Sequence, residues 1–246
     1  MLFKKSLRFS IIIPVLNEEK NILTLTNCII NILKNYVYEI IFVDDNSSDG
    51  SKKILEKLKI RFKNFNYIIR KDKKKDLFKS CSLGIKRSKY EYVLIMDGDL
   101  QHNPKYIPLM VKKIFVKKAD VIVGARNFKE NISNSLTAIR LISSKFIRLL
   151  IFIFFGKKTM DPLSGYFIFK KEIFIKNEKK LYGYGFKILY DIIYNVNDLV
   201  IADLKINFDR RRFGKSKMSV TILVQLICLF IFCFFRKVFG ICIRIK

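Results

Sequence analysis

Short apolar runs alternate with longer segments of helical character through the first half of this 246-residue chain, and this alternation restricts the fold more than any other feature. Parallel strands must be joined by a crossover, usually a helix, so the pattern is typical of βαβ units around a mainly parallel sheet. The predicted strands cover residues 9–15, 39–43, 67–69, 92–96 and 120–123. The predicted helices cover residues 18–34, 49–62, 78–88 and 104–117.

The length and composition predict one α/β domain followed by a tail. Half of the residues are hydrophobic, which is enough to fill one substantial core. We expect the domain to cover residues 1–217 and an apolar, membrane-associated segment to cover residues 218–246. Near the N-terminus, Pro14 and the polar residues 17–19 interrupt the apolar stretch, so it is predicted to be a first strand and not a signal peptide.

The chain is strongly basic, with 48 Lys and Arg residues against 21 Asp and Glu residues and a formal net charge of +27. Such a charge favours phosphate-rich partners, namely nucleic acid, an anionic membrane surface or a nucleotide-sugar, although a general compositional bias would also produce it. A nucleic-acid-binding protein would gather arginines and aromatic residues on one exposed face. The aromatic residues here lie mostly within apolar runs, so we expect no nucleic-acid partner.

Two apolar segments in the second half of the chain suggest contact with a membrane. Residues 220–235 would reach roughly 24 Å as a helix, against about 30 Å for a bilayer core. This segment therefore either crosses the bilayer, if tilted or extended through residues 238–243, or lies on it. Residues 149–155 are flanked by basic residues, as expected for a helix in the headgroup layer. For both segments the alternative is a buried core helix. The five cysteines form no CxxC pair, which favours a reducing compartment.

The strongest local motif is an acidic pair at the end of the predicted strand 92–96. Asp97 and Asp99 follow this strand with Gly98 between them. Ligands of open α/β sheets bind at the carboxyl ends of the strands, and two carboxylates there can hold a hard cation such as Mg²⁺ or Mn²⁺. The metal would neutralise the charge of a departing diphosphate. The alternative is that both acids are ordinary turn residues.

A second acidic pair, Asp44 and Asp45, follows the predicted strand 39–43. Asp45 is placed to accept hydrogen bonds from a base or a ribose. Alternatively, both residues only end the strand and cap the next helix, which residues 47–49 open.

These segments, together with Ile-Ile-Ile-Pro-Val-Leu-Asn-Glu-Glu at residues 11–19, resemble the family-2 glycosyltransferases of the GT-A fold. Further matches resemble the polyprenol-phosphate (dolichol-phosphate) mannosyltransferase group, and they lie at residues 123–126, 161–167, 185–189 and 211–219. The resemblance runs in order from about residue 9 to residue 219. It implies a Rossmann-like, mainly parallel α/β sheet flanked by helices, with interfacial or membrane-associated helices towards the C-terminus.

The resemblance also implies roles for individual residues. The nucleotide would be bound by Pro14, Leu16, Glu18, Val43 and Asp45. The metal and diphosphate would be bound by Asp97, Gly98, Asp99 and Gln101. The donor and acceptor phosphates would be bound by Arg126, Arg140, Lys187 and Arg211, with Ser216 close by. Arginine suits this role because its planar fork binds phosphate oxygens in pairs.

The sequence departs from the family at several positions. Leu16 stands where an aromatic residue is usual, which would weaken stacking on the nucleoside. Asp76 and Phe78 stand where two glycines of a Gly-Leu-Gly-like turn are common, which bears on donor preference and on activity. Asn46 also replaces a glycine, a milder change because Asn tolerates the left-handed backbone.

The expected function is inverting transfer of a hexose, with mannose from GDP-mannose as the leading donor, to a polyprenyl or dolichyl phosphate at the cytoplasmic membrane face. A lipid phosphate is already anionic and needs no strong base, and we expect His102 to be a loop residue beside the metal site. The alternatives are a UDP-sugar donor, or a glycan or lipopolysaccharide hydroxyl as acceptor. A hydroxyl acceptor would require a carboxylate base, for which Asp191 is the candidate. A nucleotide-binding protein without turnover is a third reading, and no oligomeric state is predicted.

Overall fold

The computed structural model describes residues 7–72, 74–127, 138–209, 213 and 220–239. Within this part of the chain, the strands form one seven-stranded sheet in the order β3-β2-β1-β4-β6-β5-β7. The sheet is parallel except for β6, which is antiparallel to both β4 and β5. The strands are β1 Arg8–Val15, β2 Val37–Asp44, β3 Phe65–Ile69, β4 Tyr92–Ile95, β5 Val121–Arg126, β6 Phe167–Lys170 and β7 Ile201–Ile206. The prediction of a mainly parallel α/β sheet is confirmed.

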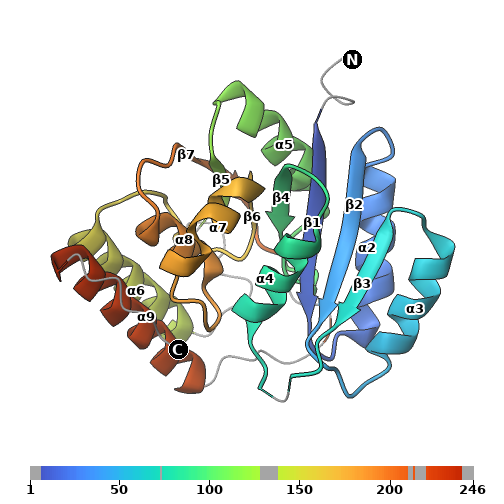
Figure 1. Ribbon diagram of the computed structural model, residues 1–246, viewed down its shortest axis with the longest axis horizontal. Helices are drawn as coiled ribbons and strands as arrows, with labels where there is room; N and C mark the ends of the chain where they lie inside the picture. The colour runs from blue at the N-terminus through green and yellow to red at the C-terminus, as the bar shows by residue number, and fades with distance from the viewer. Residues whose placement is uncertain (1–6, 73, 128–137, 210–212, 214–219, 240–246) are drawn as a thin grey trace.

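The helices form layers on both faces of this sheet (Figure 1). They are α2 Glu19–Ile32, α3 Ser51–Arg61, α4 Leu77–Arg87, the short 3-10 helix η1 Pro104–Tyr106, α5 Ile107–Val116, α6 Ala138–Phe155, α7 Lys171–Asn177, the 3-10 helix η3 Glu178–Lys180, α8 Ile188–Asn195 and α9 Val220–Phe239. Each predicted strand is present, and so are the four predicted helices, the last of them divided into η1 and α5. Strand β6 and strand β7 were not predicted.

Alternation along the strands divides the core between the two faces. In β1, Ile11 and Ile13 pack with α2, α3 and α5, whereas Ile12 between them packs with α4, α7 and α8. Near-continuous apolar strands such as β1 are expected in a sheet covered on both faces. The candidate site lies beyond these apolar runs, at the carboxyl ends of the strands.

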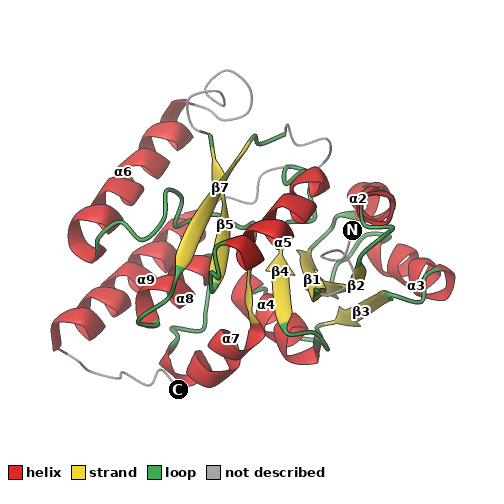
Figure 2. Ribbon diagram, turned by 90° about the horizontal axis from the view of Figure 1, so that it is seen from above, coloured by secondary structure: helices red, strands yellow, loops and turns green. Residues whose placement is uncertain are grey.

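The two apolar segments form α6 and α9, which pack against α8 at the end of the molecule away from α3 (Figures 1 and 2). Ile151 of α6, Tyr190 of α8 and Leu229 of α9 belong to one buried cluster. Other residues of both helices remain exposed, including Ile153 and Ile227. Where their side chains are described, both helices thus combine packed residues with exposed apolar residues. Among the described residues, no helix combines the length and the apolar character needed to cross a bilayer.

Candidate active site

The carboxyl ends of three adjacent parallel strands form the candidate site. Strands β2, β1 and β4 lie side by side, so the loops that follow Asp44, Val15 and Ile95 meet at one edge of the sheet. The backbone N–H of Asp45 donates to the carbonyl of Val15 over 2.8 Å, which ties the first two loops together. The predicted motifs at these strand ends are therefore neighbours in space.

Two asparagines in the left-handed backbone region shape the first two loops. Asn17 has a φ of 54° and Asn46 a φ of 57°, a conformation that asparagine tolerates better than most residues. The side-chain oxygen of Asn17 accepts from the backbone N–H of Ser48 over 2.8 Å, and Ser47 Oγ accepts from the N–H of Asn17 over 2.8 Å. Asn46 thus fills the expected role of a glycine, and the two nucleotide loops form one hydrogen-bonded unit.

The residues expected to bind the nucleotide differ in what they can offer a ligand. Pro14 and Val43 are buried register partners in β1 and β2, and the Val43 side chain packs in the core, where it offers a ligand no polar group. Leu16 is partly exposed in the loop after β1. Glu18 is buried, and its carboxylate accepts from Asn21 Nδ2 over 2.6 Å.

Asp45 is buried with both carboxylate oxygens engaged. Oδ1 accepts from Arg70 Nη1 over 2.6 Å, and Oδ2 accepts from the backbone N–H of Asp76 over 2.8 Å. Burial raises the pKa of Asp45, against the lowering effects of the Asp76 hydrogen bond and of the charges of Arg70 and Lys75. Asp44 Oδ2 accepts from the backbone N–H of Ser47 over 3.1 Å, and Asp49 Oδ1 accepts from the N–H of Ser51 over 3.0 Å. The N-cap of α3 is Gly50, which makes no side-chain cap hydrogen bond.

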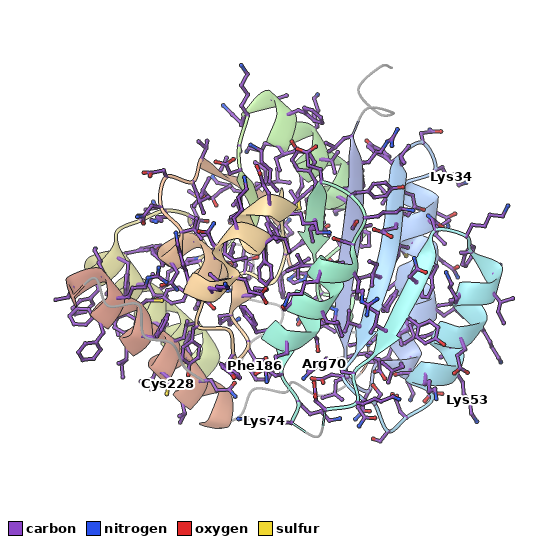
Figure 3. All side chains as sticks on the ribbon, in the orientation of Figure 1. Lys34, Lys53, Arg70, Lys74, Phe186 and Cys228 are labelled. Atoms are coloured by element: carbon purple, nitrogen blue, oxygen red, sulfur yellow. The ribbon has the colours of Figure 1, made fainter. Side chains whose placement is uncertain are left out.

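Arg70 is a site residue that the sequence reasoning missed. It directly follows β3, and only 4% of its surface is exposed. Its guanidinium also forms an ion pair with Asp72 over 2.8 Å and donates to Ser80 Oγ over 3.1 Å. Figure 3 shows Arg70 at the edge of the molecule where β2 and β3 end. The available signal was a charged residue at the end of a predicted strand.

The loop after β4 places the acidic pair close to the end of β1. A Cβ atom on Gly98 would lie 2.6 Å from Val15 Cγ1, so this close approach requires glycine. Asp99 is buried, and its Oδ1 accepts from the backbone N–H of Gln101 over 3.1 Å. The Asp97 side chain is more open, with 40% of its surface exposed. A Cβ on Gly165 would lie 2.9 Å from Asp97 Oδ2, so the 161–167 motif packs directly against this carboxylate.

His102 is buried beneath the loop after β4 and accepts a hydrogen bond from it. Its Nδ1 accepts from the backbone N–H of Asp97 over 3.0 Å, and its ring is stacked on Tyr166 with the centroids 5.0 Å apart. Burial lowers the pKa of His102, against the raising effect of the charges of Asp97 and Asp99. It is a buried loop residue beside the acidic pair, as expected, and it orients the backbone of Asp97.

Two cationic residues from distant segments contact the 161–167 motif that packs against Asp97. Arg126, at the end of β5, forms a two-pronged ion pair with Asp161, with Nε–Oδ2 at 2.6 Å and Nη2–Oδ1 at 2.9 Å. Burial alone would raise the pKa of Asp161, but the charge and hydrogen bonds of Arg126 outweigh it and hold this pKa below its ordinary value. Lys187 Nζ donates to the carbonyl of Leu163 over 3.0 Å. Burial and the charge of Arg126 lower the pKa of Lys187, whereas Asp97 and Asp161 act in the opposite direction.

Other predicted residues lie outside the described part or away from a catalytic role. Arg211, Ser216 and the side chain of Arg140 lie outside the described residues. Asp191 has 1% of its surface exposed and accepts backbone N–H groups from Tyr182 and Gly183, at 2.9 and 3.0 Å. Burial raises its pKa to about 6. These contacts define a structural carboxylate.

The side chains at this edge fit a metal ion that takes only one or two ligands from the protein. Water molecules and the substrate would supply the others. Within the described ranges, no cluster of three or more His, Cys, Asp or Glu side chains is arranged to hold an ion. Magnesium and its analogues are commonly bound through one or two carboxylates together with substrate phosphates. Asp97 and Asp99 match this requirement, with Gln101 adjacent to them.

The fold and the site together define an α/β protein with an acidic pair at the carboxyl edge of its sheet. The sequence model of glycosyl transferase family 2 matches residues 10–177, and the chain belongs to this family. The chain is 31% identical over 215 residues to a dolichol-phosphate mannosyltransferase of Pyrococcus furiosus, covering 87% of this chain and 60% of that relative's length. It is 28% identical over 234 residues to the dolichol-phosphate mannosyltransferase of Saccharomyces cerevisiae, covering 89% and 84% of the two chains.

A solved structure supports the fold assignment. Glucosyl-3-phosphoglycerate synthase from Mycobacterium tuberculosis, in complex with Mn²⁺, UDP-glucose and phosphoglyceric acid, is similar with a TM-score of 0.70 and 17% identity. The match covers 93% of this chain and 80% of that one. The chain therefore has a GT-A-like fold.

Proposed function

We propose that this glycosyltransferase moves a hexose, with mannose from GDP-mannose as the expected donor, onto a polyprenyl or dolichyl phosphate with inversion at the sugar. The 161–167 motif carries this proposal, because it contacts groups from three distant segments. Asp161 pairs with Arg126, the carbonyl of Leu163 accepts from Lys187, and Gly165 packs against the Asp97 carboxylate, which can hold a metal. The names of the two mannosyltransferase relatives support the choice of donor and acceptor.

Each group at the sheet edge has a role in this reaction. Asp97 and Asp99, with Gln101, would hold Mg²⁺ or Mn²⁺, which supplies Lewis-acid stabilisation of the departing diphosphate. The loops that carry Pro14, Leu16, Glu18, Val43 and Asp45 would hold the nucleotide. Arg126 and Lys187, with Arg140, Arg211 and Ser216 as further candidates, would bind the donor and acceptor phosphates. These charges stabilise the transition state by being fixed before reaction.

The acceptor phosphate supplies the nucleophile. One of its anionic oxygens attacks the anomeric carbon, a new phosphate–sugar bond forms, and the bond from that carbon to the diphosphate breaks. The nucleoside diphosphate leaves with the electron pair, and no proton must be removed from the acceptor. A hydroxyl acceptor would need a base, and Asp191, the candidate for that role, is buried with its oxygens engaged. This observation favours the lipid phosphate over a glycan hydroxyl.

The exposed faces of α6 and α9 support a location on the anionic cytoplasmic surface of a membrane. Leu149 and Ile153 of α6 are 54% and 65% exposed, and Ile227 and Ile231 of α9 are 50% and 46% exposed. Basic residues border these exposed side chains: Arg148 lies in the middle of α6, Lys157 and Lys158 follow α6, and Arg236 and Lys237 lie in the last turn of α9. Apolar side chains bordered by basic ones are typical of helices that lie in the headgroup layer.

Parallel transfer assays test this proposal. The full chain is incubated with polyprenyl phosphate and Mn²⁺ and with labelled GDP-mannose, UDP-glucose or UDP-N-acetylglucosamine. Label from GDP-mannose in the organic phase, released by mild acid, is the expected result. If only a UDP-sugar gives labelled product, the proposed GDP-mannose donor is wrong. If label appears only in a glycan fraction, the proposed lipid-phosphate acceptor is wrong.

A further inference from the structure

Asp76, which replaces an expected glycine, joins two segments that lie 109 residues apart in sequence. It is 2% exposed and stands at the N-cap of α4. Its Oδ1 accepts from the backbone N–H of Lys79 over 3.0 Å, which caps the helix, and its Oδ2 accepts from the backbone N–H of Gly185 over 3.0 Å. A glycine at this position could make neither bond.

The second departure from the family strengthens the same junction. The backbone N–H of Phe78 donates to the carbonyl of Gly185 over 2.8 Å, so Gly185 is held through both its N–H and its C=O. The Phe78 ring is buried and packs against Phe174 with the centroids 6.0 Å apart, which anchors the start of α4 in the core. Gly185 has a φ of +89°, a conformation that favours glycine. We call this pair of hydrogen bonds the 76–185 junction.

The 76–185 junction lies between the expected nucleotide and phosphate sites. On one side, the backbone of Asp76 donates to Asp45 Oδ2 over 2.8 Å and accepts from Arg70 Nη1 over 2.9 Å. On the other side, Gly185 precedes Lys187 by two residues, and Lys187 bonds the carbonyl of Leu163 in the motif that packs on Asp97. The neighbouring Phe186 lies at the same edge of the molecule as Arg70 (Figure 3).

We infer that Asp76 is a positioning residue: its carboxylate fixes the loop 183–187 and thereby places Lys187 relative to a nucleotide held at Asp45. This inference rests on the proposed function, in which Lys187 contacts a phosphate. Small displacements of a fixed charge reduce the rate strongly, so loss of the carboxylate acts on kcat. Nucleotide affinity changes little, because Asp45 is held by the backbone N–H of residue 76, which every non-proline substitution retains.

Two variants of the full chain separate this role from simple support of α4. Asp76→Ser keeps an oxygen that can cap the helix, but its single short hydroxyl cannot also reach Gly185. Ser88→Ala is the matched control at the other end of α4, where Ser88 Oγ donates to the carbonyl of Ile85. The measurements are kcat for sugar transfer, the Kd of GDP by calorimetry, and hydrogen exchange of the amides in residues 183–187.

For Asp76→Ser we expect kcat to fall about tenfold to hundredfold, while the Kd of GDP changes by less than about threefold. Exchange in residues 183–187 becomes faster in this variant. Ser88→Ala leaves kcat and that exchange unchanged even where it lowers the melting temperature. Unchanged kcat in Asp76→Ser overturns the inference, and so does a loss of GDP affinity in proportion to kcat.

Failure of the proposed function is distinguishable from failure of this inference. If the unmodified chain transfers no sugar to any lipid phosphate, the proposed function is wrong. Hydrogen exchange is then the measurement that tests the role of Asp76. Unchanged protection of residues 183–187 in Asp76→Ser then overturns the inference, and faster exchange supports the loop-fixing role.

Discussion

Gly165→Ala should weaken metal binding without unfolding the protein. The new Cβ would lie 2.9 and 3.1 Å from the two carboxylate oxygens of Asp97 and 3.2 Å from its Cγ. Relief of these contacts moves the carboxylate by roughly 0.3–0.5 Å, whereas metal–ligand distances hold to about 0.2 Å. Changes of this kind beside a metal ligand typically cost about tenfold to hundredfold in metal affinity. We expect at least the lower figure.

The assay is a Mn²⁺ titration in the presence of GDP, with the melting temperature measured in parallel. Gly50→Ala is the matched control, because its Cβ also meets a carboxylate, that of Glu19. Glu19 is exposed, so its flexible side chain can swing into solvent and Mn²⁺ affinity should not change. Equal Mn²⁺ affinity in Gly165→Ala and the unmodified chain would refute the placement of Asp97 as a ligand.

Three further predictions concern the support around the site. Asp161→Asn leaves Arg126 without its carboxylate partner and should lower the free energy of unfolding, measured by urea denaturation, by about 3 kcal/mol. An unchanged free energy of unfolding would contradict the pairing. Because burial lowers the pKa of His102, the unfolded chain binds this proton more readily than the folded chain as pH falls through about 6.5, so His102 contributes a fall in the free energy of unfolding from pH 7.5 to 5.5. His102→Asn should reduce that fall, and an unchanged pH dependence would count against it. Gly98→Ala should lower the melting temperature through its contact with Val15, at a cost of about 1–3 kcal/mol, and Val15→Ala in the same chain should recover part of the loss.

The parallel half of the sheet and the acidic strand ends were predictable because their signals are local. Each apolar run of β1, β2 and β4 is followed directly by its polar residues, and parallel strands bring such ends to one edge. The tolerance of Asn46 for positive φ was likewise a property of one residue and its position.

Contacts between distant segments were not predictable by this reasoning. Strand β6 has four residues, and its antiparallel insertion between β4 and β5 is determined by pairing that a short apolar run does not encode. The ion pair of Arg70 with Asp45 and the bond of Asp76 to Gly185 join residues 25 and 109 positions apart. From the sequence, Asp76 is only the absence of a flexible glycine, whereas in the fold its carboxylate accepts two hydrogen bonds.

The central claim is that the acidic pair after β4 holds a cation for the leaving diphosphate, and Asp99→Asn tests it most directly. Asn keeps the shape of Asp99 and an oxygen that can accept from the N–H of Gln101, so the loop should survive. Mn²⁺ binding in the presence of GDP, followed by electron paramagnetic resonance, should be lost together with sugar transfer while the melting temperature stays within about 2 °C. Undiminished Mn²⁺ binding and full transfer in this variant would contradict the claim.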